Sequence, residues 1–453
     1  MAEPHRHRPM RKLRLAPLVA ATYFMVSGGP YGLEDIVGQA GYLRALALLL
    51  IIPILWSLPT ALMVGELAST LPEEGGFYVW VRRALGPFWG FQEAWLSLTA
   101  SIFDMAVYPT LFVAYLSQLD PALTAGHHGV LWALAVVLVC VLWNLSGAYS
   151  VGQGSIWMFV LLLTPFVGIL GFGLWHATLH PLGPRNFVAP LGGSMTTALL
   201  VTLWNYMGWD NASTVAREVD DPQRTYFLAM IAAVTIVTFS YVVPIAVVAW
   251  SGIPAAGFVT GSWVQAARML ANPSGLGRIL ATAVVAGGAI TAIAMFNALT
   301  LSYARVPAAM AVDGYLPPIF ARRMANGVPW VAVIACGIGW ALALGFSFTR
   351  LLELDVMLYG LSLILEFIAL IALRVREPDL HRPYRVPGGM PMAIALGACP
   401  ALLIAFAIYA SRDDRLSQHL PALLLGGILV ALGPVLYWLR PARHTDNAHA
   451  EKS

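Results

Sequence analysis

Apolar stretches long enough to cross a lipid bilayer recur along almost the whole chain, and they constrain its fold more than any other feature. A spanning helix needs roughly 20 mostly apolar residues, because the hydrocarbon core is about 30 Å thick. Backbone polar groups inside the bilayer must bond to one another, so the chain is predicted to be an all-α polytopic membrane protein of about twelve helices. The predicted spans are 15–40, 43–70, 88–118, 129–147, 154–176, 194–218, 226–250, 277–306, 328–348, 352–373, 391–411 and 419–439.

Composition excludes several other classes of protein. Apolar residues make up 59% of the chain and charged residues only 11%, whereas soluble domains average about 45–50% and about 25%. Most of the surface is therefore expected to face the lipid bilayer. The net charge of +3 provides no basic field for nucleic acid. The three cysteines lie singly in apolar runs, without the spacing of metal ligands or redox pairs, so no metal and no cofactor are expected.

The distribution of Lys and Arg predicts the orientation of the chain. With the N-terminus inside, the segments on that side carry 19 of the 26 Lys and Arg residues, and the other side carries 7. Because positively charged loops stay in the cytoplasm, both termini are predicted to be cytoplasmic, in an inner or plasma membrane. Residues 1–11 and 441–453 are predicted to be disordered tails on either side of one membrane domain, 12–440.

Two predicted spans contain residues that interrupt an α-helix. The first span holds Gly28, Gly29, Pro30 and Gly32, and the sixth holds Gly208; Gly and Pro weaken or break helices. A kink in a packed helix would explain either one alone. Interruptions in both the first and the sixth helix are the pattern of a transporter built from two inverted repeats of five helices. The predicted parts are a first repeat, 12–176, a second repeat, 194–373, and two final helices, 391–440.

An unwound helix inside a membrane frees backbone groups, which is tolerated only beside a polar cavity. Freed N–H groups attract a carboxylate, and freed carbonyl groups attract an ammonium group. Ser27, Gly28 and Gly29 are therefore candidates to bind the carboxylate of a ligand, while Asn205 and Gly208 flank the second interruption. The pattern predicts a small amine or amino acid as the ligand.

Acidic side chains within the spans are a second indication of function, because each ionised group there costs about 2.5–3.5 kcal/mol on insertion scales. Asp210 lies beside the second interruption, and Asp104 lies four residues before Tyr108, on the same helical face. Glu34 follows the first interruption. Asp210, Asp104 and Glu34 are the candidates to carry a coupling proton.

Other acids receive a simpler interpretation. Asp355 is close to a predicted outer helix end and is expected to be solvated. Glu66, Glu73 and Glu74 lie toward the cytoplasmic side and are expected to pair with Arg82 or Arg83.

Aromatic residues gather near the interruptions and the acids, and aromatic faces attract ammonium ions with about 0.5–2 kcal/mol each. Tyr31, Tyr108 and Trp204 are favoured as ligand contacts because each neighbours an interruption or an acid. Ordinary packing and an interfacial belt are the alternatives.

At this point the chain resembles the amino acid–polyamine–organocation (APC) superfamily, and within it the polyamine uptake transporters of the plant type. The motifs that carry the resemblance cover 19–390, and they are VSGGPYGLED (26–35), WSLP (56–59), GGFYVWV (75–81), LGPFWGFQ (85–92), Asp104 with Tyr108 and Pro109, LWN (203–205), WD (209–210), EVDDPQRT (218–225), DGYLP (313–317) and RPYRVP (382–387).

The resemblance implies a LeuT-like fold and secondary transport by alternating access, with proton-coupled uptake or exchange. It places Ser27, Gly28 and Gly29 at the unwound turn of the first helix, Asp210 at an acid implicated in coupling, and Trp204 against the substrate. The chain departs from the polyamine carriers at Thr60, where they have Glu, at Met105, where they have Asn, and in 294–302, which lacks their acids.

Polyamines and cationic or neutral amino acids remain alternative substrates, and symport and exchange remain alternative modes. A non-transporting amine sensor on the same scaffold is a further alternative. A membrane enzyme is disfavoured because the sequence has no His-rich metal set, nucleophile elbow or phosphate loop. Oligomeric state is left open. The candidate substrate-binding residues are Ser27, Gly28, Gly29, Tyr31, Asp104, Tyr108, Trp204, Asn205, Gly208 and Asp210.

Overall fold

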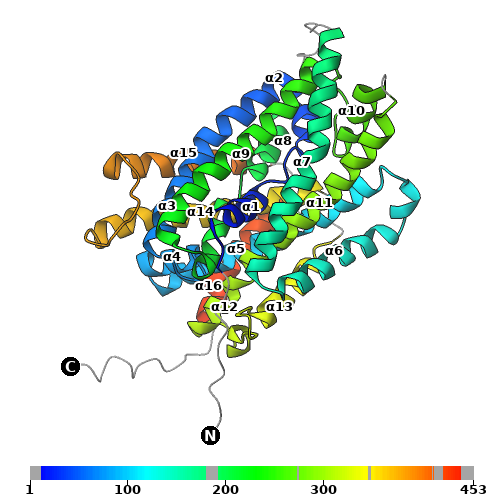
Figure 1. Ribbon diagram of the computed structural model, residues 1–453. Coiled ribbons are helices and arrows are strands. Elements are labelled where there is room, and N and C mark those ends of the chain that lie inside the picture. The colour runs from blue at the N-terminus through cyan, green and yellow to red at the C-terminus, as the bar shows by residue number, and fades with distance from the viewer. Residues whose placement is uncertain are drawn as a thin grey trace, which may run out of the picture.

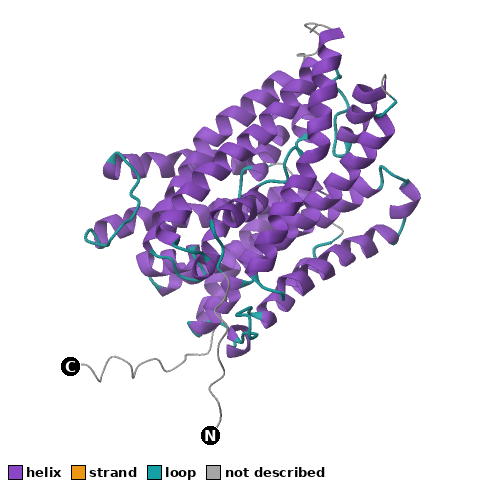
Figure 2. Cartoon of the chain, viewed as in Figure 1, coloured by secondary structure: helices purple, strands orange, loops and turns teal. Residues whose placement is uncertain are grey.

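The structure is a computed structural model, and it describes residues 12–179, 192–272, 275–344, 348–410, 412 and 422–439. Regular structure in these residues is helical, apart from one isolated bridge between Leu13 and Val219 (Figure 2). The predicted tails, 1–11 and 441–453, lie outside the described residues.

The first part of the chain contains the first interrupted helix. Helix α1 ends at Val26 and α2 begins at Glu34, so the interruption occupies 27–33. Gly41 then turns the backbone sharply within α2, with φ 75° and ψ 165°, where the first predicted span gives way to the second. The elements are α1 (Leu15–Val26), α2 (Glu34–Ile52), the π-helical turn η1 (Pro53–Ser57), α3 (Leu58–Thr70), α4 (Phe77–Leu85), α5 (Pro87–Leu116), the 3₁₀ turn η2 (Pro121–Thr124), α6 (His128–Asn144) and α7 (Ala148–Leu179).

The second part contains the second interruption. Helix α8 ends at Asn205, and the chain resumes at Trp209 as the 3₁₀ helix η4. The elements are α8 (Met195–Asn205), η4 (Trp209–Glu218), α9 (Pro222–Trp250), α10 (Ser262–Ala271), α11 (Gly277–Tyr303), α12 (Arg305–Val312), the 3₁₀ turn η6 (Pro318–Ala321), α13 (Trp330–Ala341), α14 (Phe348–Arg376), α15 (Gly389–Ala410) and α16 (Ala422–Leu439).

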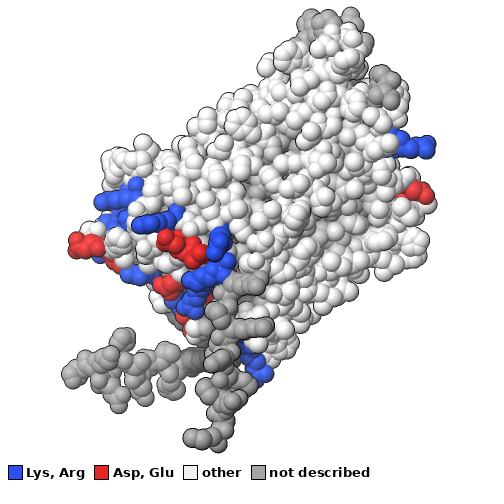
Figure 3. Space-filling view, viewed as in Figure 1, with Lys and Arg blue, Asp and Glu red and all other residues white. Residues whose placement is uncertain are grey.

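The helices and the surface agree with a membrane protein. Seven helical stretches in the described residues are long and apolar enough to cross a bilayer. Large apolar side chains such as Trp157 and Val167 on α7 and Leu402 on α15 are exposed, as lipid-facing residues should be. Figure 3 shows an uncharged flank with charged side chains gathered mainly at one end. The multi-pass, all-α prediction is confirmed, while the count of twelve spans and the inverted repeat stay predictions.

The two interrupted helices lie inside the bundle. Helix α1 is almost entirely buried and contacts α7, α9, α11 and η4, and Figure 1 shows it at the centre of the molecule. Helices α5 and α14 pack along each other beside this centre. Since the neighbouring helices cover both interruptions, the freed backbone groups meet other protein groups rather than lipid, as the bilayer requires.

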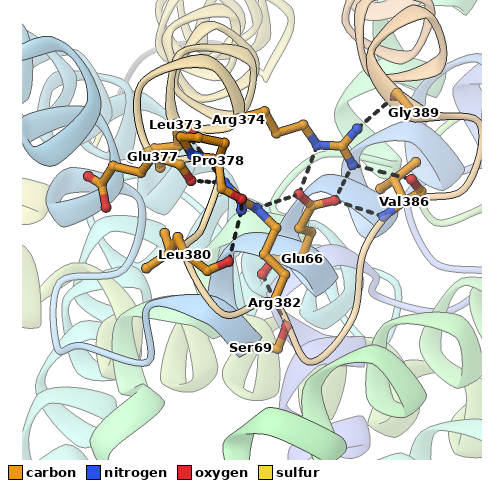
Figure 4. A network of polar contacts seen from close by, with 10 residues as sticks. All are labelled: Glu66, Ser69, Leu373, Arg374, Glu377, Pro378, Leu380, Arg382, Val386 and Gly389. Atoms are coloured by element: carbon orange, nitrogen blue, oxygen red, sulfur yellow. Dashed lines mark hydrogen bonds and ion pairs between the residues drawn. The ribbon is translucent and has the colours of Figure 1, made fainter.

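Buried ion pairs fix the charged end of the bundle. Glu66 of α3 accepts hydrogen bonds from Arg374 Nε (2.9 Å) and from the Val386 N–H (2.7 Å), and Arg382 Nε lies 3.4 Å from its carboxylate. Figure 4 shows Glu66 between the two guanidinium groups, with Arg374 also donating to the Gly389 carbonyl. The network ties α3 to the end of α14 and to the segment that leads into α15.

The pairing expected for Glu66 and Glu74 at this end is therefore wrong, whereas Glu73 is an electrostatic neighbour of Arg83 as expected. Glu74 pairs with Arg323 (2.8 Å), and Arg82 and Arg83 pair with Asp313 and Glu377 instead. The physical reason is that the helical bundle brings segments more than 200 residues apart to the same end, closer than the residues that follow in sequence.

Candidate functional site

Glycines and a capping acid stabilise the first interruption. Gly29 and Gly32 have φ of 68° and 87°, a backbone conformation that glycine adopts without strain. The Gly29 N–H donates to Ser27 Oγ (3.0 Å), and the Gly32 N–H donates to Glu34 Oε2 (2.7 Å). The freed N–H groups of this turn are thus partly used within the protein.

The second interruption lies directly against the first. Gly208 has φ of 93°, and a Cβ there would collide with the carbonyl group of Met25, the penultimate residue of α1. Asn205 Nδ2 donates to the Gly32 carbonyl (3.4 Å), which joins the two interruptions. The Gly208 N–H donates to Tyr359 Oη (2.9 Å) on α14. Glycine at 208 therefore allows the two broken helices to touch.

A small cavity opens where the two interruptions meet α5, α11 and α14. Every residue that lines it is buried, so the cavity lies inside the bundle rather than at its surface. None of these residues is Lys, Arg or His, and two are acids. The lining residues are Met25, Val26, Asp104, Tyr108, Trp204, Met207, Gly208, Asn211, Tyr303, Asp355 and Tyr359.

Asp104 of α5 is held by aromatic donors. Its Oδ1 accepts from Tyr108 Oη (2.6 Å) and Trp204 Nε1 (3.2 Å), and its Oδ2 accepts from Tyr303 Oη (3.4 Å). The rings of Tyr108 and Trp204 stack with centroids 6.0 Å apart. This arrangement fixes a carboxylate beside aromatic rings, and carboxylates and aromatic rings both attract an ammonium ion.

Asp355 of α14 is the second acid of the cavity. It is 1% exposed, so the expectation that it is solvated is wrong. Its Oδ2 has no hydrogen-bond donor, and Asp104 is its charged neighbour. The sequence placed it near a helix end, whereas α14 begins at Phe348 and carries Asp355 past its first turns into the bundle. The cavity thus holds two adjacent carboxyl groups, one of which is without a donor.

Asp210, the strongest sequence candidate, lies behind the cavity rather than in its lining. It is buried on η4, and Tyr359 Oη, which does line the cavity, donates to its Oδ1. Asp210 is therefore connected to the cavity through one tyrosine hydroxyl.

The other sequence candidates divide into two groups. Trp204, Tyr108, Asp104 and Gly208 line the cavity, as described above. The remaining candidates lie outside its lining, and they are Ser27, Gly28, Gly29, Tyr31, Glu34, Asn205 and Asp210. Tyr31 Oη donates to the Val284 carbonyl (3.1 Å).

Glu34 joins the first interruption to the loop before α10. Besides the Gly32 N–H, its carboxylate accepts from the Gly261 N–H (3.0 Å) and from Tyr115 Oη. Its neighbour Asp35 accepts from Thr260 Oγ1 (2.5 Å). These contacts close the bundle at the end opposite to the charged one.

At the charged end, a second set of contacts closes the bundle. The Leu13 N–H donates to the Glu218 carbonyl (2.7 Å), and the Asp220 N–H donates to the Leu13 carbonyl (2.8 Å). Arg305 Nε donates to the Glu218 carboxylate (2.8 Å). Since these contacts join the segment before α1 to the end of η4, both interrupted helices are held at this end too.

Sequence reasoning missed several residues of the cavity. No local sequence pattern indicated Tyr303 or Asn211, because their helices bring them to the site only in the folded bundle. A pattern did indicate Asp355, since it lies four residues before Tyr359 and shares its helical face. That spacing repeats the Asp104–Tyr108 pair of α5.

Two interrupted helices that meet at a buried, acid-lined cavity in the centre of a membrane bundle define a secondary transporter of the LeuT-like fold. The crystal structure of MhsT in complex with L-phenylalanine has this fold: it aligns with a TM-score of 0.59, at 14% identity, over 89% of this chain and 99% of that chain. The amino acid permease family model matches residues 19–431, and the chain belongs to that family.

Curated relatives agree with the family and make it a family of transporters rather than enzymes. Polyamine transporter PUT1 of Oryza sativa subsp. japonica is 35% identical over 92% of this chain and 78% of its own length. Polyamine transporter RMV1 of Arabidopsis thaliana is 30% identical over 93% and 85%. The serine/threonine exchanger SteT of Bacillus subtilis (strain 168) is 26% identical over 73% and 75%.

Proposed function

We propose that this transporter carries polyamines, binding one ammonium group of the substrate between Asp104 and Asp355. One observation carries the proposal: two adjacent carboxyl groups line a buried, aromatic cavity that no cationic residue lines. Buried carboxylates without a cation are destabilising, and an ammonium ion that enters relieves this.

The donors around the two acids support an amine rather than an α-carboxylate. Three hydroxyl and indole groups already donate to Asp104, so it is fixed in place, while Asp355 Oδ2 is open to a new donor. An ammonium group supplies donors and no acceptor. The rings of Tyr108, Trp204 and Tyr303 then give cation–π contacts of about 0.5–2 kcal/mol each.

The names of the relatives support the same substrate class, since PUT1 and RMV1 are named polyamine transporters. The departures at Thr60 and Met105 remove groups that those carriers have, but Asp355 supplies a second acid beside Asp104. Amino acids are the alternative substrate, as the names of SteT and the ligand of MhsT suggest. The amides near Ser27 to Gly29, which would hold their carboxylate, lie outside the lining of the cavity.

Transport would proceed by alternating access across the inner or plasma membrane, with the charged end in the cytoplasm. Opening to the outside would separate Glu34 and Asp35 from the loop before α10. Opening to the cytoplasm would separate the Leu13 backbone from Glu218. Proton coupling is part of the proposal, and Asp210, Asp104 and Glu34 are the sequence candidates for it. Of these, Asp104 lines the cavity and Asp210 is one hydroxyl away.

Thermal stabilisation of the purified protein in mild detergent tests the substrate class. A ligand that binds only the folded state adds about 2.7 kcal/mol at a hundredfold excess over its dissociation constant. We expect putrescine and spermidine to raise the unfolding temperature of the wild type, and amino acids to leave it unchanged. A shift with amino acids alone would overturn the polyamine proposal and favour the exchanger.

A further inference from the structure

Two more carboxyl groups, those of Glu93 and Glu366, lie where α5 packs against α14. The contact between these helices is here named the α5–α14 seam, and its four acids are Glu93, Asp104, Asp355 and Glu366. Glu93 and Glu366 are each 0% exposed, and neither lines the cavity. No role in the proposed substrate site requires them. A buried acid in a membrane protein demands an explanation, because the bilayer offers it no solvation.

The seam has a regular geometry. Glu93 precedes Asp104 by eleven residues on α5, and Glu366 follows Asp355 by eleven residues on α14. Eleven residues are close to three helical turns, so each pair shares a face and is separated by about 16.5 Å. Arg376, the last residue of α14, donates to the carbonyl of Ala84 (2.5 Å), which lies in α4 three residues before α5 begins, so the end of α14 lies near the start of α5.

The two helices therefore run in opposite directions, and their acids form two pairs along the seam. The first level is the pair Asp104 and Asp355, and the second level is the pair Glu93 and Glu366. Asp104 and Asp355 are neighbours at the cavity. Glu366 has Asp210 and Glu93 as its charged neighbours, and Glu93 also interacts with Asp210. The second level lies toward the charged end of the bundle, since Glu93 is near the start of α5. Asp210 lies beside both its acids and contacts the cavity through Tyr359.

The second level lacks partners for its charge. Neither oxygen of Glu366 has a hydrogen-bond partner, and Glu93 Oε2 has none either. Ser97 Oγ donates to Glu93 Oε1 (2.8 Å). In the part of the chain that the structure describes, no Lys, Arg or His pairs with either acid. Two adjacent buried carboxylates without a cation repel each other and are poorly solvated, so this level requires a positive charge.

We infer that Glu93 and Glu366 together hold one proton, and that this pair, rather than Asp210, Asp104 or Glu34, is the site at which a proton couples to transport. A proton is the cation that fits, because the pair lies outside the cavity that would admit an amine. When the charged end opens, water reaches the pair, the carboxylic O–H bond breaks and water accepts the proton. Asp210 and Tyr359 link this release electrostatically to the occupancy of the cavity. The inference rests on the proposed transport function but names residues that it does not use.

Infrared spectroscopy tests the proton without any substrate. We expect purified wild-type protein at neutral pH to show the carbonyl band of a protonated carboxyl group in an apolar environment. Glu366→Gln and Glu93→Gln should each reduce this band, because either change removes one of the two groups that share the proton. Glu73→Gln, at an exposed position outside the spans, is the matched control and should leave it unchanged. A band of equal intensity in all four proteins would overturn the assignment.

Transport in proteoliposomes tests the coupling. For each coupled proton, a pH gradient drives about tenfold accumulation per pH unit. We expect both Gln variants to lose accumulation of labelled putrescine driven by a pH gradient, but to keep exchange of labelled for unlabelled putrescine at equal pH. Loss of both activities would indicate a structural role and overturn the inference, as would wild-type accumulation by Glu366→Gln. Should the wild type not move putrescine, the proposed substrate fails while the infrared result still decides the proton site.

Discussion

Replacing Asp355 by Asn separates the role of this acid in binding from any role in folding. Asp355 Oδ2 is buried without a donor beside another carboxyl group, so its charge does not stabilise the empty protein. A hydrogen bond to a charged group is worth about 1.5–3 kcal/mol. Losing that contact with an ammonium group should raise the dissociation constant for putrescine about 10- to 150-fold. The unfolding temperature of the unliganded variant should stay the same or rise.

Calorimetric titration of purified protein measures the dissociation constant, and thermal unfolding in the same detergent measures stability. Asp379→Asn, an exposed residue after α14, is the matched control and should change neither quantity. Asp104→Asn should weaken binding and also lower the unfolding temperature, because three side chains donate to that carboxylate. Wild-type affinity of Asp355→Asn for putrescine would refute the reasoning.

Three further predictions follow from contacts other than those of Asp104 and Asp355. Glu66→Gln should cost about 3–5 kcal/mol in chemical unfolding, because it leaves the buried Arg374 guanidinium without a counter-charge; a loss below 1 kcal/mol would contradict this. Glu377→Gln should cost only about 0.2–1 kcal/mol, because its pair with Arg83 is 32% and 39% exposed. Hydrogen bonding to Arg83 lowers the pKa of Glu377, so the difference between wild type and Glu377→Gln should be present at neutral pH and vanish as the pH falls below the usual carboxyl range. Gly208→Ala should abolish putrescine uptake while the protein still reaches the membrane, because a Cβ there meets the backbone of α1; normal uptake would contradict it.

Hydrogen bonds hold the interrupted helices at both ends of the bundle. Glu34 and Asp35 bond to the loop before α10, and Leu13 bonds to the segment after η4. The first set attaches to the first interrupted helix, and the second set joins both interrupted helices. A change in either interruption is therefore transmitted to one end of the molecule, which is the mechanical requirement of alternating access.

Local signals in the sequence determined much of this protein. Runs of apolar residues predicted the helices, and Gly and Pro predicted both interruptions, because backbone preference and bilayer thickness act on consecutive residues. The i, i+4 spacing of Asp104 and Tyr108 predicted that they share one helical face, and the structure shows that they are hydrogen-bonded there.

Only the tertiary structure decided which polar groups meet. Asp355 lies in the cavity rather than at the solvated helix end that the sequence predicted. Glu66 pairs with Arg374 rather than with Arg82, and Glu93 is a neighbour of Glu366. These pairs are separated by more than 200 residues, and their approach depends on the packing of α3, α5 and α14. Sequence spacing fixes the face of a helix on which a side chain lies, but the partner of that face is set by how the helices pack.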